Sequence, residues 1–160
     1  GTLVETADDV RRVLDGSDVR FCLDTGHLAI GGTDPVAFAG EAAARVAHVH
    51  LKDVRQEVAA RLRAEEVSLV EAVQLGLFRP LGEGDLPVAD TVLALERQGY
   101  EGWYVLEQDT TVDSAAIPEG TGPVEDVRRS VAFLHQCLTP AEAGFGASKG
   151  VTRSANRASR

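Results

Sequence analysis

Three side chains that commonly bind metal ions lie at or near the ends of apolar runs in this sequence. They are Asp24, His50 and Glu107. Two carboxylates and one imidazole suit Mn²⁺, Co²⁺, Mg²⁺ or Zn²⁺. If the runs are neighbouring parallel strands, the three side chains can converge on one divalent cation. The alternative for each residue alone is structural, because an aspartate at a strand end often caps a loop or helix and a lone histidine is often a hydrogen-bonded core residue.

Three further polar side chains follow these positions and are candidate substrate contacts. His27 can bind a substrate hydroxyl or carbonyl, or it can simply close a turn. Lys52 and Arg55 can neutralise an oxyanion. Each can instead be a solvated surface charge, an alternative that weighs more for Arg55.

Parallel strands are the elements that must position these residues. Short apolar runs that end in a charge predict buried strands over 19–24, 46–51 and 103–107. Side chains alternate between the two faces of a strand, and this parity allows the three candidate ligands to point to the same side.

Helical segments alternate with these strands. Asp34 is a typical helix cap, and Ser68 with Glu71 is typical of a capping box. Glycines within 26–32 predict a loop, and Trp103 is expected to pack against the helix before it. Helices are predicted over about 7–14, 35–45, 56–75 in two pieces, 87–99 and 124–138.

Three strands, each followed by a helix, indicate right-handed parallel βαβ units and therefore an α/β fold. The 160 residues are too few for a complete (βα)₈ barrel, which needs roughly 250. Because three strands leave open sheet edges, we expect part of a larger sheet or barrel. No glycine-rich phosphate-binding loop follows a strand, so a dinucleotide-binding fold has no support. The chain begins with Gly1 and contains no methionine, and we expect it to be a piece of a longer chain.

The composition excludes several classes of partner. A formal net charge of −9 disfavours nucleic acid and anionic membranes. No apolar run is long enough to span a membrane, and no signal peptide is visible. Cys22 and Cys137 are expected to be reduced thiols in a cytoplasmic protein. Residues 1–138 are expected to form the folded part, followed by a disordered basic tail over 139–160.

Four segments resemble the xylose isomerase-like TIM barrel superfamily, which includes sugar-phosphate isomerases and epimerases. They are Leu-Asp-Thr-Gly-His (23–27), His-Val-His-Leu-Lys-Asp-Val-Arg (48–55), Leu-Gly-Glu-Gly-Asp (81–85) and Gly-Tyr-Glu-Gly-Trp-Tyr-Val-Leu-Glu-Gln-Asp (99–109). Within the superfamily, the long insert over 54–73 resembles the inosose dehydratases most. The resemblance implies a partial (βα)₈ TIM barrel made of its three C-terminal βα units.

The resemblance also implies roles for single residues. Asp24, His50 and Glu107 match the metal ligands, His27 matches a substrate contact, and the glutamate at position 107 can double as an acid/base group. The family site has a fourth ligand, a glutamate on an earlier strand that this sequence does not contain. Glu5 lies in the segment that resembles the loop after the fifth strand, and it is not a convincing replacement.

The implied activity is that of a divalent-metal-dependent lyase or isomerase acting on a small polyol or keto-sugar. A carboxylate removes a proton beside a carbonyl, and the metal stabilises the enediolate. Dehydration of an inosose in myo-inositol catabolism is the first interpretation, and sugar isomerisation or epimerisation is the alternative. A second alternative is an inactive half-barrel, stable only as a homo-oligomer or with a missing N-terminal half.

Overall fold

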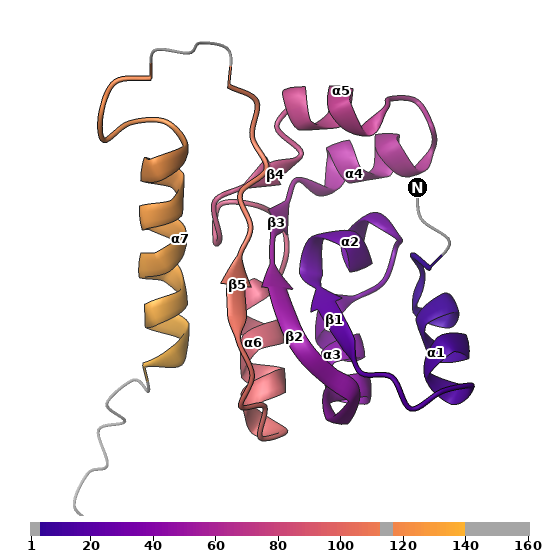
Figure 1. Ribbon diagram of the computed structural model, residues 1–160. Helices are drawn as coiled ribbons and strands as arrows, with labels where there is room; N and C mark the ends of the chain where they lie inside the picture. The colour runs from indigo at the N-terminus through magenta and orange to yellow at the C-terminus, as the bar shows by residue number, and fades with distance from the viewer. Residues whose placement is uncertain (1–3, 113–116, 140–160) are drawn as a thin grey trace, which may run out of the picture.

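Three parallel strands form the central sheet of this protein (Figure 1). They are β1 (Phe21–Asp24), β2 (Val46–Leu51) and β5 (Tyr104–Leu106), in the order β1-β2-β5. The parallel pairing confirms the α/β fold predicted from the sequence. Because β2 is the central strand and all three strands are parallel, the carboxyl ends of β1 and β5 lie on either side of the carboxyl end of β2.

The computed structural model describes residues 4–112 and 117–139. Helices connect the strands, as the sequence predicts, and a short two-stranded antiparallel sheet follows β2. The remaining elements are α1 (Ala7–Asp15), α2 (Thr25–Ile30), α3 (Pro35–Ala42), η1 (Ala43–Arg45), β3 (Asp53–Val54), α4 (Gln56–Arg63), α5 (Leu69–Gln74), β4 (Phe78–Arg79), α6 (Val88–Arg97) and α7 (Pro123–Leu138).

The hydrophobic core lies between one face of the sheet and the helices α3 and α6, which stand behind the strands in Figure 1. Three side chains of β2 are fully buried on this face, namely Val46, Val49 and Leu51. No described helix lies in front of the strands in Figure 1, and Trp103, which directly precedes β5, is 77% exposed. The expectation that Trp103 packs against the preceding helix is therefore wrong.

A short helix replaces the loop that the glycines predict after β1. The carboxylate of Asp24 accepts a hydrogen bond from the backbone N–H of His27 and so caps α2. Leu28 and Ile30 of this helix are buried in the core. The cap and the buried apolar side chains outweigh the low helix propensity of Gly26.

A buried carboxylate organises the loop between β4 and α6. The side chain of Asp53 is fully buried and accepts hydrogen bonds from the backbone N–H groups of Gly82, Gly84 and Leu86, at 2.9–3.0 Å. A Cβ atom at position 84 would collide with this carboxylate, so the loop requires glycine there. Burial raises the pKa of Asp53, and these N–H donors offset part of that rise.

The predicted boundary between a folded part and a basic tail over 139–160 stays a prediction, because almost all of that tail lies outside the described residues. Among the described residues, no helix combines the length and the apolar character that crossing a membrane requires.

Replacing Asp53 by asparagine is expected to lower the free energy of unfolding by about 1–3 kcal/mol. In either orientation of the asparagine amide, its NH₂ group faces at least one backbone N–H that donates to the carboxylate in the wild type. Two donors then oppose each other, and that hydrogen bond is lost. Urea unfolding followed by far-UV circular dichroism measures the change. Glu101→Gln, which removes an exposed carboxylate, is the matched control. Equal stability of the two variants would contradict the structural role of Asp53.

Candidate functional site

The structure brings together the side chains of Asp24, His50 and Glu107 at the carboxyl ends of the three strands. The parallel register pairs Asp24 of β1 with His50 of β2. Atom Nδ1 of His50 lies 2.7 Å from Oε1 of Glu107 and 3.7 Å from Oδ2 of Asp24. One potential ligand atom from each of the three residues lies within 4.8 Å of the other two.

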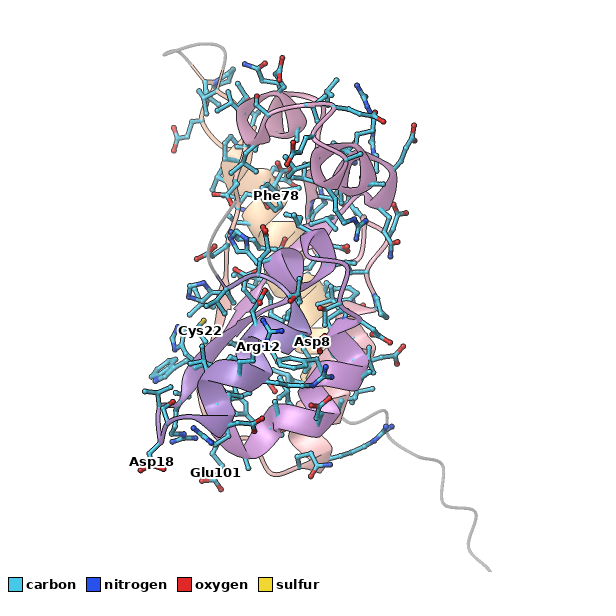
Figure 2. All side chains as sticks on the ribbon, turned by 90° about the vertical axis from the view of Figure 1, so that its right-hand side faces the viewer. Asp8, Arg12, Asp18, Cys22, Phe78 and Glu101 are labelled. Atoms are coloured by element: carbon cyan, nitrogen blue, oxygen red, sulfur yellow. The ribbon has the colours of Figure 1, made fainter. Side chains whose placement is uncertain are left out.

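Glu107 follows the last residue of β5 and continues its pairing with β2. The backbone N–H of Glu107 donates to the carbonyl of Leu51 at 3.2 Å. This bond fixes the backbone from which the carboxylate reaches His50. Figure 2 shows Phe78 toward the end of the sheet that carries α4 and α5, while Asp18 and Glu101, which precede β1 and β5, lie at the opposite end. The three candidate ligands lie at the end of the strands nearer Phe78.

Lys52 places a buried ammonium group among these carboxylates. Its side chain is only 6% exposed, and Nζ lies 2.6 Å from Oε2 of Glu107 and 3.7 Å from Oδ2 of Asp24. A third carboxylate, that of Asp109, lies 2.9 Å from Nζ. Burial by itself lowers the pKa of Lys52, but the hydrogen bonds to Glu107 and Asp109 outweigh it and leave that pKa raised. Lys52 therefore carries its positive charge at neutral pH.

Thr25 and Gly26 position the backbone from which Lys52 extends. The hydroxyl of Thr25 donates to the carbonyl of Lys52 at 2.6 Å and accepts from its N–H at 2.9 Å. Thr25 is fully buried, so these two bonds hold the ends of β1 and β2 together without water. A Cβ at position 26 would lie 2.8 Å from the Cβ of Lys52, and only glycine leaves room for this approach.

Asp24 combines the two interpretations that its sequence position leaves open. Its Oδ1 accepts the N–H of His27 and caps α2, while its Oδ2 faces His50 and Lys52. The cap restricts rotation of the carboxylate, because one oxygen is already fixed by the helix. The second oxygen is held where it can bind a cation.

The two other predicted substrate contacts differ in their placement. His27 is exposed and, with Lys52, Phe78 and Asp109, lines a cleft of about 470 Å³ beside the carboxylates. Arg55 is exposed at the N-cap of α4, and its backbone N–H donates to the carbonyl of Leu77. Its guanidinium makes no ion pair with the described residues, so the structure does not bring Arg55 into the cluster.

Asp109 is the residue of the site that sequence reasoning missed. It lies two positions after Glu107, and residues two apart in an extended segment point to the same side. That spacing was the available signal. The predicted strand ended at position 107, so a carboxylate beyond it was not expected to turn back toward the site.

The donor set fits a divalent cation. Carboxylate oxygens and an imidazole nitrogen are ligands for Mn²⁺, Mg²⁺, Co²⁺ and Zn²⁺, and the three side chains are 13–30% exposed, which leaves room for water or substrate as further ligands. The Nδ1 atom of His50 faces an oxygen of Glu107 in this structure. A metal ion binds an imidazole nitrogen only when that nitrogen carries no proton. Glu5 is not part of this cluster as the structure describes it.

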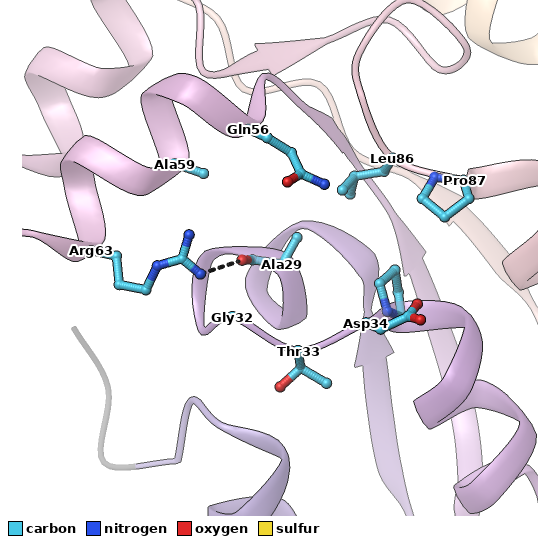
Figure 3. Close-up of a pocket in the computed structure, with 10 residues that line it drawn as sticks. Ala29, Gly32, Thr33, Asp34, Gln56, Ala59, Arg63, Leu86 and Pro87 are labelled. Carbon is cyan, nitrogen blue, oxygen red and sulfur yellow. Dashed lines mark hydrogen bonds between the residues drawn. The ribbon is translucent and has the colours of Figure 1, made fainter.

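A second hollow, of about 380 Å³, lies between α2, α4 and the start of α6 (Figure 3). The side chain of Arg63 donates to the carbonyl of Ala29 at one side of it, at 3.4 Å. Its lining, drawn from the described residues, includes none of the six predicted site residues. The chemistry therefore gathers at the strand ends and not in this hollow.

Comparison with known proteins gives one family. The model of the xylose isomerase-like TIM barrel family matches residues 1–137. A solved xylose isomerase-like TIM barrel/4-hydroxyphenylpyruvate dioxygenase fusion protein has a TM-score of 0.55 and 20% identity, covering 90% of this chain and 23% of that one. At that identity the likeness concerns the fold alone.

Curated relatives are similar over a shorter span. An inosose dehydratase of Geobacillus thermodenitrificans (strain NG80-2) is 38% identical over 112 residues, which cover 68% of this chain and 38% of the relative. The rhizopine catabolism protein MocC of Rhizobium meliloti is 38% identical over 117 residues, covering 72% of this chain and 36% of that protein. The chain thus spans well under half the length of these relatives, and the resemblance stated from its motifs is confirmed.

Thr25→Val is expected to lower the free energy of unfolding by about 1–3 kcal/mol, because the buried N–H and carbonyl of Lys52 lose their partner. Thr25→Ser keeps the hydroxyl and removes one methyl group, which costs about 0.8 kcal/mol. Urea unfolding of the two variants measures the difference. A serine variant as unstable as the valine variant would show that packing, and not the hydroxyl, joins the two strands.

Proposed function

Since this chain belongs to the xylose isomerase-like TIM barrel family, we propose that it forms the catalytic end of a divalent-metal-dependent dehydratase that acts on a cyclic keto-polyol of the inosose type. The convergence of Asp24, His50 and Glu107 on one point supports the metal site. The similarity to an inosose dehydratase supports the substrate class. The expected location in the cytoplasm stays a prediction.

Three residues would hold the cation, namely Asp24, His50 and Glu107. When bound, a divalent cation supplies Lewis-acid polarisation of a substrate carbonyl, which eases loss of a proton from the adjacent carbon. The carboxylate of Glu107 accepts that proton as the general base. The protonated Glu107 then returns this proton to the hydroxyl group one carbon further, which leaves as water and completes the dehydration.

The neighbouring residues would bind and orient the substrate. The ammonium of Lys52 stabilises negative charge that develops on the carbonyl oxygen. The imidazole of His27 lines the cleft from the first turn of α2, where it can bind a hydroxyl group of the polyol. The exposed Arg55 is the weakest of the predicted contacts, because its side chain reaches none of the other described site residues.

Isomerisation or epimerisation of a keto-sugar is the alternative reaction. It uses the same proton abstraction, and it differs only in where the proton returns. The family match supports both reactions equally, since it concerns the whole superfamily. The similarity to an inosose dehydratase favours the lyase.

A chimera tests the reaction directly. Residues 1–138 of this chain replace the corresponding segment of the Geobacillus inosose dehydratase, which then supplies the strands that this chain does not match. We expect dehydration of inosose in the presence of Mn²⁺, loss of activity with EDTA, and a loss of at least roughly 100-fold in Asp24→Ala or Glu107→Ala, because metal-bound groups stabilise the transition state. The Glu101→Gln chimera is the control. Undiminished turnover by the alanine variants would contradict the proposed metal site.

We also infer that the isolated chain requires a neighbouring segment at the open edge of β1. Val10, Val13 and Leu14 of α1 and Phe21 of β1 line an apolar groove of about 330 Å³ there. Val13 is 42% exposed, and β1 is one of the two edge strands of the described three-stranded sheet. A parallel strand from the remainder of a barrel would pair with this edge and bury the groove.

Without such a segment, the chain is expected to self-associate at micromolar concentration, because edge strands and exposed apolar side chains pair readily. Multi-angle light scattering after size exclusion measures its mass. Val13→Glu, which puts a charge in the groove, should shift the population toward monomer. A stable monomer in both cases would contradict the need for a neighbouring segment.

A further inference from the structure

Lys52 and the cation of the proposed function compete for the same carboxylates. The ammonium lies 2.6 Å from Glu107 and 3.7 Å from Asp24, and both residues are candidate metal ligands. A divalent cation bound to these oxygens repels a neighbouring ammonium. The two positive charges can share the site only if Lys52 has another partner.

Asp109 is such a partner. Its carboxylate lies 2.9 Å from Nζ of Lys52, and Asp109 is not among the described residues whose ligand atoms converge with His50. Its side chain is 49% exposed, compared with 13% for Asp24 and 30% for Glu107, so it lies farther toward solvent. The ammonium can therefore keep a strong ion pair while it leaves the metal ligands.

The ring of Phe78 is a second group outside the candidate metal ligands that contacts the ammonium of Lys52. Nζ of Lys52 lies over this ring, 5.1 Å from its centroid, and a cation over an aromatic face is stabilised. Phe78 and Asp109 both line the cleft of about 470 Å³ that also contains His27. In the structure Nζ lies between Glu107, at 2.6 Å, and these two groups, so a carboxylate and an aromatic face are available to the ammonium on the side of the cleft.

From this geometry we propose that Asp109 is a positioning residue, which draws the ammonium of Lys52 off the metal ligands Asp24 and Glu107 toward the substrate cleft. Lys52 would then face a substrate oxygen in the cleft, and a cation held by Asp24, His50 and Glu107 would supply Lewis-acid polarisation. Asp109 touches neither the cation nor the reacting carbon, and it acts through Lys52. The proposal rests on the proposed metal site.

A double-mutant cycle on Mn²⁺ affinity tests it, measured by isothermal titration calorimetry on the 160-residue chain. The four proteins are the wild type, Asp109→Asn, Lys52→Met and the double variant. Asp109→Asn should weaken Mn²⁺ binding roughly tenfold while Lys52 is present, because the ammonium then has only the metal ligands to pair with. In the Lys52→Met background the same change should cost less than about threefold.

Additive effects would overturn the proposal, because they would show that Asp109 acts on the cation directly. A wild type that binds no Mn²⁺ would overturn the proposed metal site and this inference with it, whereas binding with an additive cycle overturns the inference alone. Urea unfolding of the four proteins in EDTA separates loss of the fold from loss of the site. Asp109→Glu, which keeps the charge, should retain wild-type affinity within about threefold.

Phe78→Leu keeps the inference testable if the Lys52→Met chain does not fold. This change removes the aromatic face beneath the ammonium without removing a charge. Because cation–π contacts are weaker than ion pairs, the expected loss of Mn²⁺ affinity is about two- to fivefold. Unchanged affinity in Phe78→Leu would contradict the idea that the position of Lys52 controls metal binding.

Discussion

The parallel pairing of β1, β2 and β5 is the constraint on which the rest of this structure depends. It sets Asp24 beside His50 and continues one residue beyond β5, through the bond between Glu107 and Leu51. Three polar side chains from distant parts of the chain therefore meet at one end of the sheet. The buried hydroxyl of Thr25 reinforces the pairing where the chain leaves both strands. A change in register would move these three candidate ligands apart or turn them to the other face.

Charge balance is the second constraint, and it follows from the first. The pairing gathers the carboxylates of Asp24, Glu107 and Asp109 around a lysine that is almost fully buried. Burying an ammonium without partners would be costly, and bringing carboxylates together without a cation would be costly too. The buried ammonium and the three carboxylates therefore stabilise one another. The arrangement also gives the site a positive group of its own, which a bound cation must accommodate.

Local signals in the sequence predicted the convergence of the three candidate ligands better than they predicted the helix and loops around them. Asp24, His50 and Glu107 could be predicted as neighbours from the sequence, because side chains alternate along every strand and parallel strands run in one direction. The helix α2 could not be predicted, because its stability comes from the Asp24 cap and from side chains buried by tertiary contacts. The role of Asp53 depends on a loop that folds back over it, and no local pattern shows such a contact. For Asp109 the one local signal was its spacing of two residues from Glu107, and its contact with Lys52 lies beyond the end of the predicted strand.

The central claim is that Asp24, His50 and Glu107 form a single binding site for a divalent cation. Anomalous diffraction at the manganese edge, from crystals of the chain grown with Mn²⁺, tests it most directly. We expect one strong anomalous peak bounded by Oδ2 of Asp24, Nδ1 of His50 and an oxygen of Glu107. A map with no peak there, while the three side chains keep the positions described, would contradict it.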